Sequence, residues 1–167
     1  VSPGVAEKGQ LELYTLAVPT EKDNAATTQI VFTPPSGFSI DSFVPTPGWK
    51  RAVQQTGSGE NATITKVTWT GGHVPTGEDA AFSFLAAPSS AKTYSFGVQQ
   101  TYSDGSIVDW SGSESSAAPA PTIQAVSSMS GGTPTIAIVG VALGALALLV
   151  ALAGLLLRGG GGKRELA

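Results

Sequence analysis

Few residues of this chain belong to the types that carry catalysis or hold a metal tightly. His73 is the only histidine, and it stands in the segment GGHVP. No serine or carboxylate accompanies it in a motif that would form a catalytic dyad or triad, so we interpret it as a solvated loop residue. Cysteine is absent, which excludes disulfides, thiolate metal sites, iron–sulfur clusters and cysteine nucleophiles.

The carboxylates also give little evidence of acid–base chemistry. Glu78 and Asp79 are adjacent in an expected turn, and Asp104 and Asp109 flank an expected hairpin. Solvated turns explain these positions better than a pair of catalytic carboxylates does. We therefore expect that the chain is not an enzyme.

Tryptophan is the more unusual residue, because all three copies stand next to a glycine-bearing turn. They occur in PTPGWK (Trp49), VTWTGG (Trp69) and IVDWSG (Trp110). Large aromatic side chains commonly close the ends of a sandwich core, and this is the role that we expect for Trp49 and Trp69.

The elements that must position these residues are strands. Residues 1–112 show no helical periodicity, but contain short runs of β-branched and aromatic residues that end at Pro, Gly, Asn or Asp. We expect strands at 12–18, 27–33, 62–70, 80–86, 93–102 and 106–110. The Asp104-Gly105 pair predicts a hairpin with a type I′ turn between the last two. This spacing is typical of an all-β, immunoglobulin-like or fibronectin-like sandwich.

The C-terminal part differs sharply in composition. Residues 135–157 contain no charged residue, and this length is sufficient for a helix to cross a hydrocarbon core of about 30 Å. We predict one transmembrane helix here, a Ser/Ala/Pro/Gly-rich linker at 113–134, and a short basic tail at 158–167. Arg158, Lys163 and Arg164 follow the span directly, so the positive-inside rule places the C-terminus in the cytoplasm and the N-terminal domain outside the cell membrane.

Charge separates the two parts as well. Before Thr133 there are six basic and eleven acidic residues, which gives a net charge of −5, and the remaining residues carry +2. A mildly acidic domain lacks the clustered Lys and Arg that bind phosphate backbones, so we exclude nucleic acid as a partner.

Several segments in order resemble the YcnI-like family of bacterial copper-binding proteins. The most specific are VPTE, PGWK and YSDGSIVDW, and the resemblance covers about residues 1–112. It implies a protein that is secreted through a signal peptide, folds as a β-sandwich and is often anchored to the membrane at its C-terminus.

The resemblance also implies a copper(II) site. In the family, an N-terminal histidine gives its amine and imidazole, a glutamate adds oxygen and a tryptophan completes the surroundings; the last two fall on Glu21 and Trp110. Such nitrogen and oxygen donors suit tetragonal copper(II). The histidine has no counterpart, because Val1-Ser2-Pro3 is similar to the family's H-V-T-V opening entered at its second valine. Either the chain is truncated or the site is lost, and we favour truncation.

The resulting hypothesis is a membrane-anchored, extracytoplasmic copper(II)-binding protein that buffers copper or delivers it to a membrane copper transporter. One alternative is a surface β-sandwich that binds a protein and has no working metal site. Another is copper-dependent oxidation of the kind done by lytic polysaccharide monooxygenases, which bring a second histidine to the metal. This chain would have to use His73 for that purpose, so we rank this alternative last.

Overall fold

The computed structural model describes residues 1–129, which form strands and one short 3-10 helix. The elements are β1 (Val5–Glu7), β2 (Glu12–Pro19), β3 (Thr27–Thr33), β4 (Phe38–Phe43), β5 (Lys50–Thr56), η1 (Gly59–Asn61), β6 (Thr63–Val74), β7 (Asp79–Pro88), β8 (Thr93–Ser95), β9 (Gly97–Tyr102), β10 (Ile107–Trp110) and β11 (Thr122–Val126). The prediction of an all-β fold is confirmed for these residues.

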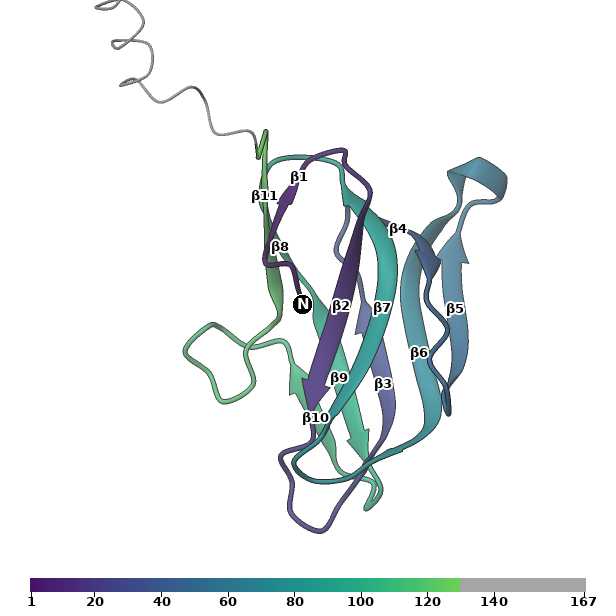
Figure 1. The fold of residues 1–167 in the computed structure, drawn as a ribbon, viewed down its shortest axis with the longest axis vertical. Coiled ribbons are helices and arrows are strands. Elements are labelled where there is room, and N and C mark those ends of the chain that lie inside the picture. Colours follow the sequence, from purple (N-terminus) through teal and green to yellow (C-terminus); the bar gives the residue numbers. More distant parts are fainter. Residues whose placement is uncertain (130–167) are drawn as a thin grey trace, which may run out of the picture. The chain divides into compact units, whose positions relative to one another are not determined.

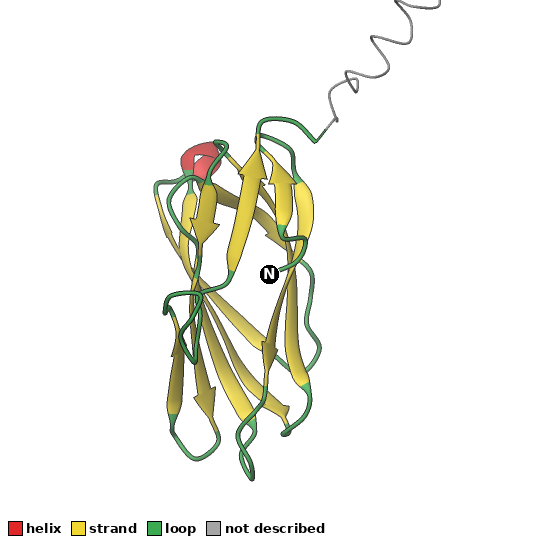
Figure 2. Ribbon diagram, turned by 90° about the vertical axis from the view of Figure 1, so that its left-hand side faces the viewer, coloured by secondary structure: helices red, strands yellow, loops and turns green. Residues whose placement is uncertain are grey.

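The strands form three sheets, two of which pack face to face as layers (Figures 1 and 2). One layer is a five-stranded sheet in the order β10-β9-β3-β6-β5. The other is the sheet β2-β7-β4, and the third sheet has the order β1-β11-β8, in which the β1–β11 pair is parallel. The layers share one core, because the inward-facing residues of alternating strands meet between them.

Aromatic side chains fill that core. The Trp69 ring stacks on Phe82 at 4.3 Å between centroids, and Phe32 packs on Phe84 at 5.3 Å. In both pairs one residue comes from the five-stranded sheet and the other from β7. Trp69 is only 2% exposed, so its predicted place in the core is confirmed.

Trp49 lies at the margin of the same core. Its ring is half-buried and meets Phe82 edge-on at 5.0 Å. A Cβ atom at Gly72 would stand 2.1 Å from the Trp49 ring, so only glycine allows the indole to lie against the backbone of β6. Trp49 therefore closes one side of the core, as predicted.

The predicted strands correspond to β2, β3, β6, β7 and β10 within a few residues. The expected strand 93–102 is two strands, because β8 pairs with β11 whereas β9 pairs with β3 and β10. The switch between sheets occurs at Phe96, which is buried and stacks on Phe32 at 5.4 Å. The short or exposed strands β1, β4, β5 and β11 were not among the predictions.

Strand β11 lies inside the segment that we expected to be a linker. Ile123 and Ala125 are buried and alternate with exposed residues, and β11 fills the gap between β1 and β8. The folded unit therefore extends to Met129 and not to residue 112. The Ser/Ala/Pro-rich residues around β11 masked its two-residue periodicity.

The hairpin between β9 and β10 is confirmed, but its turn is not type I′. That turn would require a positive φ at Asp104 and Gly105. Gly105 has a φ of 82°, whereas the non-glycine residue with positive φ among residues 1–129 is Asn24. The loop has three residues, 103–105, and Tyr102 and Ser106 pair across it, which is the arrangement of a type I turn followed by a glycine bulge.

The predicted transmembrane helix at 135–157 and the basic tail at 158–167 lie outside the described residues. Residues 1–129 include no helix that is long and apolar enough to span a bilayer.

Candidate functional site

Glu21 lies in the loop that joins β2 to β3. Its side chain is exposed, and within residues 1–129 its carboxylate has no hydrogen-bond or ion-pair partner. The loop itself is well fixed. The Thr20 amide donates to the Glu78 carbonyl and the Gly77 amide donates to the Thr20 carbonyl, both at 2.9 Å. A free carboxylate therefore stands on a restrained backbone.

The other side of this loop is held by the β9–β10 hairpin. The Ala26 amide donates to Ser103 Oγ at 3.1 Å, and the Ser103 amide donates to the Ala26 carbonyl at 2.8 Å. Lys22 forms a salt bridge with Asp104 and also donates to Ser106 Oγ at 2.8 Å. We call the three segments 20–26, 75–78 and 103–106 the site end of the domain.

Asp104 is a hydrogen-bond acceptor in this arrangement. Hydrogen bonds from Lys22 Nζ and from the Ser106 hydroxyl and amide hold the pKa of its carboxyl well below the usual range. The ionised form is therefore the one that fixes the hairpin to the Glu21 loop.

Trp110 occupies the last position of β10 and is half-buried. Its Nε1–H donates to Gln100 Oε1 at 3.0 Å. Gln100 Nε2 donates in turn to the Pro19 carbonyl at 2.8 Å and to Thr27 Oγ1 at 2.7 Å. Trp110 is thus connected through one buried amide to the backbone two residues before Glu21.

Two of these partners, the Trp110 indole and the Pro19 carbonyl, fix the orientation of the Gln100 amide. An indole N–H can only donate and a carbonyl can only accept, so Oε1 must face Trp110 and Nε2 must face Pro19. Gln100 is fully buried. A hydrogen bond of 2.6 Å between Thr27 Oγ1 and Thr20 Oγ1 extends the network to Thr20. The structure thus assigns the positioning of Trp110 to Gln100, a residue that we did not single out in the sequence.

A small apolar hollow lies beside this network. It has a volume of about 160 Å³ and is lined by Leu16, Ala17, Val18, Pro19, Val98, Trp110, Pro119 and Pro121. The first residues of the chain lie along β2. Ser2 and Thr15 exchange backbone hydrogen bonds at 2.9 and 2.8 Å in an antiparallel bridge. Going from Ser2 to Val1, the chain therefore runs toward the Pro19 end of β2.

The remaining residues that could bind metal do not assemble into a site. His73 is exposed near the end of β6 and lines a separate hollow with Asn24 and Thr76. Glu78, in the turn before β7, and Asp79, the first residue of β7, are both exposed. Residues 1–129 contain no group of three or more His, Asp or Glu side chains placed to hold a metal ion.

Comparison with known proteins identifies the family. A profile of the family described as "Domain of unknown function (DUF1775)" matches residues 1–125. The chain belongs to the DUF1775 family. This match and the relative below confirm the resemblance of the chain to YcnI-like proteins.

The DUF1775 domain is similar to a curated bacterial protein and to a solved structure. It is 35% identical over 122 residues to "Copper-binding protein CutI" of Bacillus subtilis (strain 168), which covers 71% of this chain and 57% of that protein. The match therefore spans little more than half the length of this relative. A crystal structure of an uncharacterized protein from Nocardia farcinica, described as having an immunoglobulin-like fold, matches with 33% identity and a TM-score of 0.61 over 74% of this chain and 94% of the other. The immunoglobulin-like architecture is thereby confirmed.

Replacing Lys22 by methionine is expected to raise the pKa of Asp104 toward its ordinary value of about 3.9, because Lys22 is the main cause of the lowering. A carboxyl whose pKa is lower in the folded chain stabilises the fold above its unfolded pKa, and this contribution is lost as the pH falls toward the folded pKa. An NMR titration of the Asp104 carboxyl carbon measures the shift. Lys66→Met, at an exposed position of β6, is the control; an unchanged Asp104 titration in Lys22→Met would contradict the assignment.

Proposed function

We propose that this protein is an extracytoplasmic copper(II)-binding domain that buffers copper or passes it to a membrane copper transporter. The observation that carries the proposal is the network through which Gln100 connects Trp110 to the Pro19 carbonyl, two residues before Glu21. The similarity to a protein named as copper-binding supports the choice of metal. The proposal includes a membrane anchor at residues 135–157, supported by their length and lack of charge.

One carboxylate and one indole do not make a tight copper(II) site, since this ion favours nitrogen and oxygen donors in a tetragonal arrangement. The register of the Ser2–Thr15 bridge supports a position for the nitrogen donors. If the Ser2–Thr15 pairing continues without a bulge, the third residue before Val1 lies opposite Pro19, next to the hollow that Trp110 lines. A histidine placed as in the H-V-T-V opening of the family precedes the second valine by the same three residues. We therefore propose that the missing ligand precedes Val1.

The test uses the protein isolated from its native membrane. Mass spectrometry gives the mature N-terminus, and electron paramagnetic resonance follows a copper(II) titration of the same sample. We expect a chain that begins with histidine and binds one copper(II) with nitrogen coordination. Glu21→Gln and Trp110→Phe should weaken binding at least tenfold, whereas Glu78→Gln, which removes a neighbouring exposed carboxylate, should not.

A chain that begins at Val1 and binds no stoichiometric copper would overturn the copper proposal. The fold would then be better explained as a surface module that binds another protein. Equal weakening by Glu21→Gln and Glu78→Gln would keep copper binding but remove Glu21 from the site.

A further inference from the structure

The end of the folded domain lies close in sequence to the proposed membrane span. Strand β11 and the residues after it are fixed to β1, since the Lys8 amide donates to the Val126 carbonyl at 2.9 Å and the Met129 amide donates to Glu7 Oε2 at 3.0 Å. Five residues, 130–134, separate Met129 from the span at 135. Even fully extended, this connection reaches at most about 20 Å. The predicted linker of 22 residues would have allowed several times that distance.

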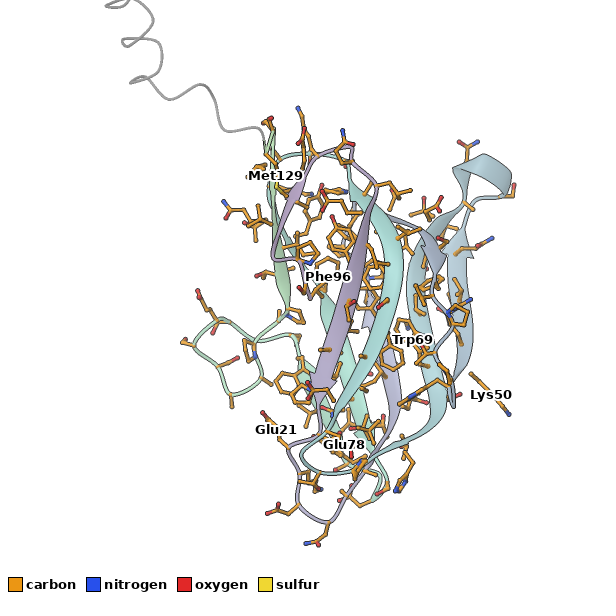
Figure 3. The ribbon with its side chains drawn as sticks, viewed as in Figure 1. Glu21, Lys50, Trp69, Glu78, Phe96 and Met129 are labelled. Carbon is orange, nitrogen blue, oxygen red and sulfur yellow. The ribbon has the colours of Figure 1, made fainter. Side chains whose placement is uncertain are left out.

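Met129 and Glu21 lie at opposite ends of the domain. Figure 3 shows Met129 at one end of the sandwich and Glu21 and Glu78 at the other. Strand β2 runs between these ends, and its eight residues cover roughly 23 Å at the usual rise per residue. We call the turn 8–11 together with Lys92 and Met129 the exit end; the Lys92 carbonyl accepts from Ala125 in β11, which places it there.

The two ends differ in charge. The site end carries four acidic residues, Glu21, Asp23, Glu78 and Asp104, with Lys22 as their basic neighbour. The exit end carries the exposed basic residues Lys8 and Lys92, which the adjacent Glu7 and Glu12 balance, and the Glu7 carboxylate accepts the Met129 amide. It also exposes two apolar side chains, Leu11 at 54% and Met129 at 49%. Anionic lipid headgroups attract basic residues and repel acidic ones.

We propose that the exit end rests against the anionic lipid surface and that the site end points away from it. The inference rests on the proposed anchor at 135–157. The short connection limits the distance between the domain and the bilayer surface. The charge difference selects which end faces the lipid, and Leu11 and Met129 supply apolar contact with it. A copper partner must then reach Glu21 and Trp110 from the aqueous side, as a soluble protein or the extramembrane domain of a transporter, and not at the bilayer surface.

The full chain allows a direct test because it has no native cysteine. Single cysteines at Gln10 and Asp23, both exposed and on opposite ends, are labelled with the same environment-sensitive fluorophore. The labelled chains are reconstituted in phosphatidylethanolamine–phosphatidylglycerol vesicles that contain headgroup-spin-labelled lipid. We expect quenching at Gln10→Cys to exceed quenching at Asp23→Cys at least threefold. Lys8→Glu combined with Lys92→Glu should reduce that ratio.

The control lengthens the connection by inserting 17 Gly/Ser residues after Ser130, which restores the linker length predicted from sequence. This insertion should bring the two quenching values close together. Equal quenching in the unmodified full chain, or stronger quenching at Asp23→Cys, would overturn the proposed orientation while leaving the anchor intact. A chain that fails to float with the vesicles would overturn the anchor, and the orientation with it.

Discussion

Replacing Gln100 by leucine is expected to lower the free energy of unfolding by about 3 kcal/mol, because a buried polar group that loses its partner costs about 1–3 kcal/mol. Leucine is similar in size but makes no hydrogen bond, so Trp110 Nε1 and the Pro19 carbonyl lose their partner and Thr27 Oγ1 loses one of two. Urea denaturation followed by circular dichroism measures the change. The Trp110 indole N–H resonance should also shift, because its acceptor is gone.

The matched control is Gln99→Leu, one residue earlier in the same strand. Gln99 is exposed, so the same chemical change should alter the free energy of unfolding by less than about 0.5 kcal/mol. If both variants lose the same stability, the cost comes from leucine in β9 and not from the network. An unmoved indole resonance in Gln100→Leu would contradict the positioning role of Gln100.

Local alternation was sufficient to predict the long, half-buried strands. In β2, Tyr14, Leu16 and Val18 point into the core while the residues between them face outward or lie partly exposed. Such a pattern is set by the strand itself, because successive side chains point to opposite faces. The ends of these strands follow from Pro19 and from the Pro34-Pro35 pair, which cannot donate ladder hydrogen bonds.

The strands that sequence analysis missed depend on pairing with other strands and not on a local pattern. Every residue of β5 is exposed, so this strand has no inward pattern, and it is a strand because it pairs with β6. Strand β11 is short and pairs with β1, which lies more than 100 residues earlier in the sequence, so this pairing is non-local. The break at Phe96 arises because β8 and β9 join different sheets, and no local signal specifies that change of partner.

The residues of the candidate site could also be predicted only in part from the sequence. Glu21 and Trp110 as site residues stay a prediction from a resemblance in short motifs, whereas Gln100, which connects Trp110 to the Pro19 carbonyl, was not predicted. A signal for Gln100 was nevertheless present, since Val98, Gln100 and Tyr102 share the inward face of β9. A polar residue at an inward position must find hydrogen-bond partners inside the protein. A polar residue between apolar residues on the inward face of a strand therefore indicates a buried hydrogen-bond network. The pattern does not identify the partners of that residue.

Replacing Trp69 by alanine is expected to have the largest effect on stability, a loss of about 4 kcal/mol in the free energy of unfolding. The indole is 2% exposed, stacks on Phe82 at 4.3 Å and meets Phe43 edge-on at 6.1 Å. Its removal leaves a cavity between two sheets whose backbones are fixed by their ladders, so the surrounding residues can collapse only in part. Urea denaturation of the folded domain measures the loss.

Trp49→Ala is the informative comparison, because both tryptophans stand beside glycine-bearing turns and look alike in the sequence. Trp49 is half-buried at the margin of the core, so water can fill the space that it leaves. We therefore expect a loss of about 2 kcal/mol, less than the roughly 3–5 kcal/mol found when a fully buried tryptophan is replaced by alanine. A loss in Trp49→Ala as large as that in Trp69→Ala would mean that the contact with Gly72 orders the β5–β6 edge as a whole. The difference between the two variants thus measures how burial, and not residue type, determines what each tryptophan contributes.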